Sequence, residues 1–594
     1  MDLGSNHLSG ILPTELGLMS KLTYLDLSNN KFVSVIPTEI GYLNSLLVLD
    51  LGVNMMTGSL PTELGSLTQL AFLSIAASSF QGILPRAFGK LKKLRTLNLF
   101  QNKLTGSLPT ELENLKSLIF LDLSFNQFNM SIPTVFGNLT QLVFFNAGNN
   151  HLTGPLPSEL GYLTRLENCS VCNNHITGTI PTELGNLAQI TDFLGFSNIV
   201  TGFIPTEFGG FTKLTSLAIN DNQLTGRIPT ELGNLAQLVS FFAFQNDLTG
   251  SLPSELGYLT NLTILSTFDN HINGTIPTEL GNLGQMYEYA VHTNSMTGPI
   301  PSEFGRLTKL TLLDVADNSI TGTIPTEIGK LAQLVFFLVY GNNLTGSLPS
   351  ELGLLTRLTK FSTNDNHITG TIPTELGNLA QMSVYAFLTN NMTGPMPSEF
   401  GRLTKLTYLA VASSNVAGTI PTEFGRLTRL TFLAVVSSSV IGTIPTELGN
   451  LVQLEYFFIY ENNLTGSLPS ELAQLSKLAT LSAFNNQLNS SFPFEYGRLL
   501  HLQALDVNRN DLTGSLPSEL GLLVNLTILD LSVNMFNNSI PSELGLLSEL
   551  QQLNVSLNNL TGTIPSSFRL LGDLCKYLCG AIYATIYPTF SFLE

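Results

Sequence analysis

A proline recurs every 24 residues along almost the whole chain, and this period constrains the fold more than any other feature. The column runs from Pro13 to Pro565 and holds 24 of the 28 prolines, with no insertion or deletion between them. A fixed period of about 20 to 50 residues is typical of solenoids, in which each repeat packs only against its neighbours. The sequence therefore predicts about 24 stacked units of 24 residues each.

One unit shows how the period is built. Leu25 and Leu27 alternate with other residues, which predicts a short strand with one buried face. Asn30 ends that strand, and its short amide can satisfy backbone groups of its own turn and of the next coil. This column is Asn in 21 of 24 units and Ser in the other three, at Ser78, Ser414 and Ser438.

The unit resembles the plant-type leucine-rich repeat, LxxLxLxxNxLxGxIPxxLGxL. The match covers roughly residues 1–570, and in one unit it rests on Leu22, Leu25, Leu27, Asn30, Phe32, Ile36, Pro37, Ile40, Gly41 and Leu43. The resemblance implies an α/β solenoid, a right-handed superhelix with a parallel sheet on its concave side. It also implies a second short strand near each LTG and a 3₁₀ or short helical turn at each PxELG.

The predicted domain organisation is one solenoid over residues 1–572 and a distinct segment over residues 573–594. Met1 lies inside a unit, with neither a capping segment nor a signal peptide before it, so we expect a fragment or a mis-started chain. The segment around Cys575 and Cys579 resembles the C-terminal cap of plant-type ectodomains, with a different cysteine spacing. The uncharged run 577–593 is either an apolar tail or a marginal membrane segment, since spanning a bilayer takes about 20 residues.

Two further cysteines lie in one unit. Cys169 replaces the first strand leucine, so we expect it to be buried. Cys172 lies three residues later and is expected to face the concave side as a free surface thiol. This spacing predicts neither a disulfide nor half of a zinc site, because no second CxxC follows.

Composition excludes several classes of function. The chain has 26 Lys and Arg against 43 Asp and Glu, a net charge of −17, so it lacks the basic face of a nucleic-acid binder. No catalytic or metal-binding motif occurs, and five of the seven histidines directly follow the Asn column in different units, as turn residues do. We therefore expect no enzymatic activity, no cofactor and no metal site.

Two columns follow each proline. Glu stands at the second position in 21 of 24 units, where a carboxylate can meet the free N–H groups at the start of a helical turn. The alternative is a row of carboxylates that recruits cations. Thr or Ser stands at the first position in 22 of 24 units, and its hydroxyl can cap the same turn. A regular row of hydroxyls is also typical of ice-binding solenoids.

The concave face carries the candidate binding residues, at the positions that flank the strand leucines. It is acidic, with Lys360 and Arg509 as its main cations. It is also rich in aromatic side chains, which are uncommon on an exposed sheet without a use. The predicted contact residues are Phe242, Phe244, Phe268, Glu288, His292, Asp314, Phe336, Tyr340, Phe458, Tyr460 and Phe484. A 96-residue cassette repeats part of this set, so either several equivalent sites or passive duplication explains the recurrence.

These observations predict a non-enzymatic scaffold that recognises a protein or glycan ligand, partly cationic, at the cell surface or outside the cell. The resemblance implies a similarity to receptor ectodomains and polygalacturonase inhibitors, although no kinase motif occurs in this chain. The alternatives are a structural or adhesive surface protein, an ice- or mineral-binding solenoid, and a cytoplasmic scaffold. Thirteen N-x-S/T sequons permit an extracellular location, but the repeat itself generates many of them. Membrane association would run through missing or C-terminal segments.

Overall fold

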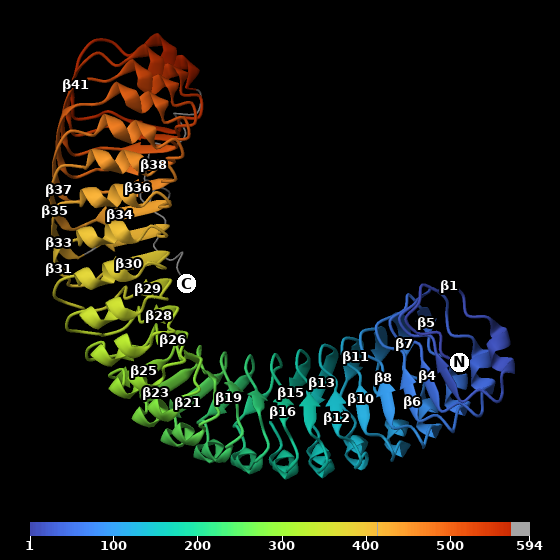
Figure 1. Ribbon diagram of the computed structural model, residues 1–594. Coiled ribbons are helices and arrows are strands. Elements are labelled where there is room, and N and C mark those ends of the chain that lie inside the picture. The colour runs from blue at the N-terminus through green and yellow to red at the C-terminus, as the bar shows by residue number, and fades with distance from the viewer. Residues whose placement is uncertain (413, 572–594) are drawn as a thin grey trace. The chain divides into compact units, whose positions relative to one another are not determined.

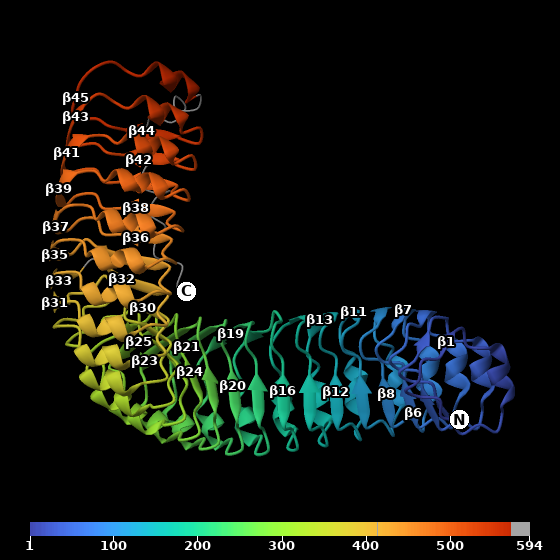
Figure 2. The same cartoon turned by 45° about the horizontal axis from the view of Figure 1, so that its top comes forward.

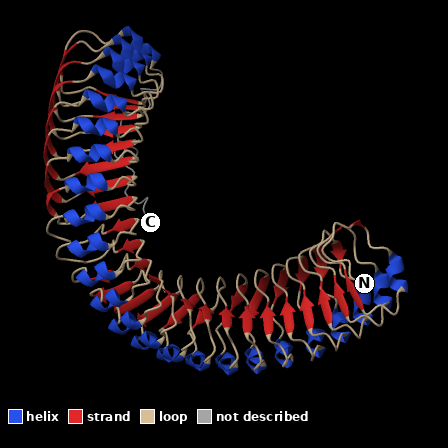
Figure 3. Cartoon of the chain, viewed as in Figure 1, coloured by secondary structure: helices blue, strands red, loops and turns tan. Residues whose placement is uncertain are grey.

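The computed structural model describes residues 1–412 and 414–571 of the chain (Figure 1). The chain divides into two compact units, Met1–Thr297 and Gly298–Glu594. In both, every coil runs from a main strand through a lateral strand or extended segment to a short helix (Figure 3). The predictions for Cys575, Cys579 and the segment 573–594 lie outside the described residues.

The main strands form a parallel sheet in each unit, in register from coil to coil: Leu25 lies opposite Leu49, and Leu433 lies opposite Phe457. In the first unit they are β2 (Tyr24–Asp26), β4 (Val48–Asp50), β6 (Phe72–Ser74), β8 (Thr96–Asn98), β10 (Phe120–Asp122), β12 (Phe144–Asn146), β14 (Asn168–Ser170), β16 (Asp192–Leu194), β18 (Ser216–Ala218), β20 (Ser240–Phe242), β22 (Ile264–Ser266) and β24 (Glu288–Ala290). In the second they are β26 (Leu312–Asp314), β28 (Phe336–Leu338), β29 (Lys360–Ser362), β30 (Val384–Leu388), β32 (Tyr408–Ala412), β34 (Phe432–Val436), β36 (Tyr456–Phe458), β38 (Thr480–Ser482), β40 (Ala504–Asp506), β42 (Ile528–Asp530) and β44 (Gln552–Asn554).

The lateral strands confirm the second short strand predicted near LTG in most coils, and they also pair in parallel with the next coil (Figure 2). The coils of Asn343 and His367 form only isolated bridges there. The earlier ones are β1 (Ser9–Gly10), β3 (Lys31–Phe32), β5 (Thr57–Ser59), β7 (Ser79–Ile83), β9 (Lys103–Gly106), β11 (Gln127–Met130), β13 (His151–Pro155), β15 (His175–Thr177), β17 (Thr201–Gly202), β19 (Gln223–Gly226), β21 (Asp247–Ser251), β23 (His271–Thr275) and β25 (Ser295–Gly298). The later ones are β27 (Ser319–Ile320), β31 (Thr393–Pro395), β33 (Asn415–Gly418), β35 (Ser439–Gly442), β37 (Asn463–Gly466), β39 (Gln487–Ser491), β41 (Asp511–Ser515), β43 (Met535–Asn538) and β45 (Asn559–Leu560).

The helical turns are 3₁₀ helices of five residues, each directly after the column proline, whose fixed φ suits the start of a turn. They are η1 (Thr14–Leu18), η2 (Thr38–Tyr42), η3 (Thr62–Ser66), η4 (Arg86–Lys90), η5 (Thr110–Asn114), η6 (Thr134–Asn138), η7 (Ser158–Tyr162), η8 (Thr182–Asn186), η9 (Thr206–Gly210), η10 (Thr230–Asn234), η11 (Ser254–Tyr258), η12 (Thr278–Asn282), η13 (Ser302–Arg306), η14 (Thr326–Lys330), η15 (Ser350–Leu354), η16 (Thr374–Asn378), η17 (Ser398–Arg402), η18 (Thr422–Arg426), η19 (Thr446–Asn450), η20 (Ser470–Gln474), η21 (Phe494–Arg498), η22 (Ser518–Leu522), η23 (Ser542–Leu546) and η24 (Ser566–Leu570). Within residues 1–412 and 414–571, no helix combines the length and apolar composition needed to span a bilayer.

The leucines of the repeat fill the inside of each coil. Leu49 and Leu51 of one coil, like Leu43 and Leu46 ahead of them, have no solvent-accessible surface. Each main strand therefore turns its leucine-bearing face inward and leaves the opposite face to other residues. Because one coil cannot enclose its own core, burial depends on the coils stacked above and below it.

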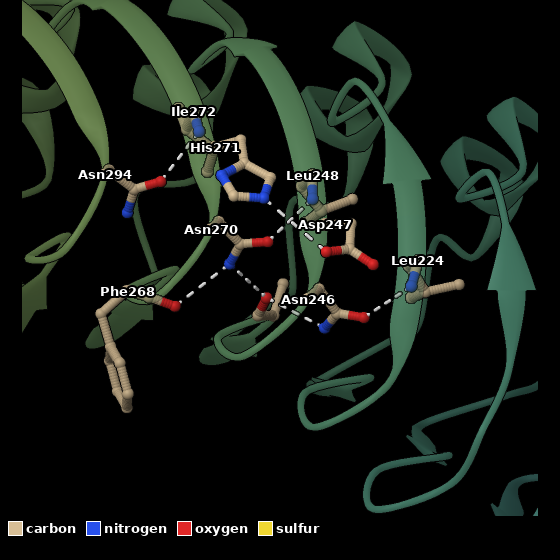
Figure 4. A network of polar contacts seen from close by, with 10 residues as sticks. Leu224, Asn246, Asp247, Leu248, Phe268, Asn270, His271, Ile272 and Asn294 are labelled. Carbon is tan, nitrogen blue, oxygen red and sulfur yellow. Dashed lines mark hydrogen bonds and ion pairs between the residues drawn. The ribbon is translucent and has the colours of Figure 1, made fainter.

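The asparagine column lies inside the stack and hydrogen-bonds the coils together (Figure 4). The Asn270 Nδ2 donates to the carbonyl oxygens of Thr267 and Phe268 in its own coil and, at 3.0 Å, to that of Ala243 in the preceding coil. Its Oδ1 accepts the Leu248 backbone N–H at 3.0 Å. The same pattern recurs along the chain, and we call it the asparagine ladder. It satisfies backbone groups that burial would otherwise leave unpaired.

The 3₁₀ helices stack through a close contact between a glycine and the glutamate of the next coil. A Cβ placed on Gly257 would lie 2.5 Å from the Glu279 carbonyl oxygen and 2.6 Å from its Cβ. The Glu279 carboxylate itself accepts a hydrogen bond from the neighbouring Thr278 hydroxyl at 3.3 Å. We expected these carboxylates to meet backbone N–H groups, but the hydrogen bond found is to the adjacent hydroxyl, which lies closer on the exposed turn.

Replacing Gly257 by Ala tests this contact. The new methyl group meets backbone atoms that cannot move aside, so we expect a loss of about 1–3 kcal/mol in the free energy of unfolding. Gly284→Ala is the matched control, since a Cβ there meets nothing within 4 Å. It should be neutral or slightly stabilising. Denaturant titration of both variants checks the prediction, and equal stabilities would contradict it.

Replacing Asn270 by Ala tests the ladder. The change leaves the buried Leu248 N–H without an acceptor and removes one of the donors to each of three carbonyl groups, so we expect a local loss of about 1–3 kcal/mol. Hydrogen exchange of the amides in the two flanking coils measures it. The exposed Asn273 serves as control, and its change to Ala should alter exchange by less than about 0.5 kcal/mol.

Candidate functional site

The variable residues of the main strands lie on the face opposite the leucines, which we call the open face. In the coil of β22 its three positions are Ile264, Ser266 and Phe268, and the residue after the third, Asp269, forms a turn with φ of +54°. The same left-handed turn recurs before most described Asn residues of the ladder. Parallel, in-register pairing places equivalent positions of successive coils side by side, about 4.8 Å apart.

In the first unit, this register stacks aromatic side chains into a continuous ladder of rings. The rings of Phe244 and Phe268 are parallel, with centroids 4.4 Å apart, and Phe268 and His292 follow at 4.3 Å. Phe242 contacts Phe244 edge to face at 6.4 Å. The three stacked rings are half-buried, so each presents an edge to solvent from a rigid arrangement. Figure 4 shows Phe268 projecting away from the buried asparagines.

The second unit repeats the arrangement with different rings. Tyr460 stacks on Phe484 at 4.6 Å, and Phe458 contacts Tyr460 edge to face at 6.3 Å. Burial raises the pKa of Tyr460 to about 12, with a smaller contribution from Glu461, so its hydroxyl stays protonated at neutral pH. Phe336 is the most exposed of the predicted aromatic residues at 42%.

An apolar patch beside these rings was not predicted from the sequence. Seven open-face residues pack together and are 0–5% exposed, with Tyr408, Phe432 and Tyr460 against them: Ala386, Leu388, Ala410, Ala412, Ala434, Val436 and Phe458. The strands β30, β32 and β34 that carry most of them are five residues long instead of three. The loss of alternation in YLAVA and FLAVV is the sequence signal that could have revealed it.

The aspartates of the open face have an internal role. The Oδ1 atoms of Asp314, Asp122 and Asp530 each accept the backbone N–H two residues later, at 2.9–3.1 Å. These side chains are only 8–9% exposed, and burial raises the pKa of Asp122. Several of the carboxylates predicted to make this face acidic therefore accept backbone hydrogen bonds and are largely shielded from solvent. The exposed carboxylates lie instead at the left-handed turns, at Asp221, Asp269, Asp317, Asp365 and Glu461.

The remaining predicted residues lie in the coils of β24, β26 and β28. Glu288 occupies the first open position of β24, is half-buried, and has its pKa raised by burial. Asp314, Phe336 and Tyr340 belong to the coils of β26 and β28 in the second unit. Lys360 is partly buried, which lowers its pKa, while Asp314 opposes that shift.

The cysteine predictions are half right. Cys169 is buried in the core as expected. Cys172 lies on the open-face side, with its Sγ 3.5 Å from the Ser170 hydroxyl, but it is 7% exposed and not a surface thiol. The neighbouring coil closes over it at Gly148, where an added Cβ would lie 2.9 Å from the sulfur. Both cysteines are free, as predicted.

Histidines and acids do not gather into a metal centre anywhere in the described ranges. The five histidines after the Asn column are exposed, as predicted, and most begin lateral strands. His151 stacks on His175 at 6.0 Å, and the His271 Nε2 lies 3.7 Å from an Asp247 carboxylate oxygen.

Comparisons with known proteins agree with this geometry. A family model described as a leucine-rich repeat region matches residues 1–105 and 86–193, and one described as a leucine-rich repeat matches 213–235, 309–331, 501–523 and 549–571. No curated protein sequence matches the chain.

Three solved structures cover most of the chain. The plant peptide hormone receptor RGFR1 in complex with RGF2 is 31% identical, with a TM-score of 0.82 over 94% of each chain. PEPR1–AtPEP1 is 32% identical, with a TM-score of 0.77 over 96% of this chain and 88% of that one. The Arabidopsis receptor kinase HAESA with the peptide hormone IDA and the co-receptor SERK1 is 30% identical, with a TM-score of 0.80 over 95% and 91%.

The buried cysteines give a testable prediction. Burial raises the pKa of Cys169 to about 12 and raises that of Cys172 as well, so few thiolates form at pH 8 and reagents cannot reach them. We expect both to react with iodoacetamide more than about 100-fold slower in the native protein than in denaturant, as peptide mass spectrometry measures. Rapid native labelling of Cys172 would contradict its burial.

Proposed function

Since the chain belongs to the leucine-rich repeat family, we propose that it is a binding scaffold that holds a protein or peptide ligand against the open face of its main strands. The observation that supports this most directly is the ladder of Phe244, Phe268 and His292. Preformed, rigid rings lose little conformational entropy when a ligand covers them, which makes them efficient anchors.

The similar structures support a peptide as the ligand. The solved structures contain RGFR1 with RGF2, PEPR1 with AtPEP1, and HAESA with IDA. RGFR1 is a plant peptide hormone receptor, and IDA is a peptide hormone. An extended peptide laid across the main strands would meet one coil about every 4.8 Å, and would place its side chains between the rings. The scaffold needs no catalytic group to do this. We propose an extracellular or cell-surface location, because the similar chains are receptor ectodomains.

Each unit contributes its own contacts. In the first unit we assign Phe242, Phe244, Phe268, Glu288 and His292. In the second we assign Phe336, Tyr340 and Tyr460. The predictions for Phe458 and Phe484 need correction, because these rings are only 3% and 9% exposed and support Tyr460 from within the sheet. The exposed carboxylates at the turns beside them, such as Asp269 and Glu461, favour a ligand with basic groups, because opposite charges steer association and exclude acidic competitors. The carboxylate of Asp314 shapes its own turn, so any contribution it makes to the ligand is indirect.

A displayed library of random peptides tests the proposal and selects its own ligands. Peptides selected on the unaltered protein should lose about 30-fold in affinity for each anchor ring removed, as in Phe244→Ser and Phe268→Ser. Phe120→Ser and Phe144→Ser form the matched control, because these rings also stack on the open face, at 4.4 Å, but lie outside the proposed contacts.

The readout is the dissociation constant of each selected peptide, with circular dichroism and thermal unfolding as checks on the fold. Equal losses in both pairs of variants, or selection of no peptide at all, would contradict the proposal. Selected peptides enriched in acidic residues would contradict the assignment of a basic ligand.

A further inference from the structure

The sequons of this chain fall into three structural places, and the fold treats them differently. Eight lie on the line of the lateral strands, three lie at the end of a 3₁₀ helix or in the turn after it, and two lie on main strands. The eight lateral asparagines are Asn129, Asn273, Asn343, Asn391, Asn463, Asn489, Asn537 and Asn559. We propose that this lateral face is N-glycosylated and that the open face stays free of glycans.

The lateral positions hold their asparagines in solvent. Each is the first or third residue after the asparagine ladder, and all eight are exposed. The residue next to each one points inward instead, as Leu344, Met392 and Leu464 show by having no accessible surface. This alternation along a strand fixes the direction of the amide away from the core.

The glycan is added to the unfolded chain and must remain in solvent after folding. A chain with a glycan on an asparagine that folding buries cannot complete that coil, so the folded protein has glycans only at sequons that the fold leaves in solvent. The transfer forms a bond between the asparagine Nδ2 and the anomeric carbon, releases the diphosphate lipid carrier of the oligosaccharide, and loses one amide proton. An Nδ2 that the folded coil uses as a donor to buried neighbours leaves no room for this substituent.

Two sequons lie on main strands, and Asn554 is of this excluded kind. Asn168 and Asn554 are half-buried on β14 and β44. The Asn554 Nδ2 donates to the Asp530 carboxylate and the Ser532 hydroxyl, each at 3.1 Å. Its Oδ1 accepts the hydroxyl of Ser556, the third residue of its own sequon, at 2.8 Å. We therefore assign no glycan to Asn554. We also assign none to Asn168, because its half-buried side chain lies between those of Phe144 and Asp192 on the paired strands.

The helix-end sequons are intermediate. Asn138, Asn261 and Asn525 are exposed, but each amide donates to an acceptor in the preceding coil, at 2.7–3.0 Å. A glycan there would cost one hydrogen bond between coils. We assign these three lower occupancy than the lateral asparagines.

The lateral glycans are unevenly placed. The second unit has six of the eight lateral sequons, the first being Asn343 and the last Asn559. Asn343 and Asn391 are two coils apart, or about 10 Å, so neighbouring glycans would form a continuous coat. The lateral strands β5, β7 and β9 carry no sequon. A partner therefore reaches the second unit through its open face and not through its lateral face.

Site mapping on protein purified from the cells that produce it tests the proposal, which rests on the proposed extracellular location. A peptide N-glycosidase in ¹⁸O-labelled water converts each glycosylated Asn to labelled Asp, and mass spectrometry locates it. We expect conversion at Asn343, Asn391 and Asn463 in most molecules and none at Asn168 or Asn554. Comparable conversion at Asn554 would overturn the assignment by place in the fold.

Variants made in a secretory eukaryotic host provide the second measurement. Asn391→Gln should increase gel mobility by one glycan without changing the fold, whereas Asn554→Gln should leave mobility unchanged. If no sequon of the native protein is converted, the glycan proposal fails. The peptide selection requires only the folded scaffold, so its result tests ligand binding independently of the glycan proposal.

Discussion

The asparagine ladder is the interaction on which the rest of the structure depends. Each coil must change direction inside the stack, where backbone N–H and C=O groups have no water to meet. One amide, with two donors and an acceptor, satisfies groups in two coils at once, as Asn270 does for Leu248 and Ala243. The 24-residue period follows, because an insertion would move the amide out of reach of the preceding coil.

Serine at this column shows what the asparagine contributes. The hydroxyls of Ser414 and Ser438 donate to carbonyl groups of their own coil, at Ala412 and Val436. The neighbouring strands β30, β32 and β34 extend to five residues, and their open-face residues form an apolar patch. Around Ser414 and Ser438, strand pairing continues further and apolar packing on the open face is greater, whereas β6 in the coil of Ser78 keeps three residues.

The three surfaces of a coil, which are the 3₁₀ side, the open face and the lateral face, differ in how strongly packing restricts their residues. Most 3₁₀ helices have a glycine that contact with the next coil fixes, as between Gly257 and Glu279, so this side varies little. The residues of the open face can vary. Because the strands pair in register, aromatic residues at the same position of successive coils stack on one another, as Phe244, Phe268 and His292 do. The lateral face exposes the first and third residues after the asparagine ladder, where eight of the thirteen sequons lie.

The sequence by itself determined the period, the buried columns and the candidate rings, because Leu25, Asn30 and Pro37 recur at fixed spacing and strand residues alternate. Only the tertiary structure decided which open-face side chains are exposed and which are buried or hydrogen-bonded to the backbone. Asp314 looked like a ligand group, but its carboxylate accepts a backbone N–H of its own turn. Cys172 looked exposed, but the coil at Gly148 covers it. The exposure of a side chain here depends on neighbours 24 residues away, and their side chains pack only once the coils have stacked.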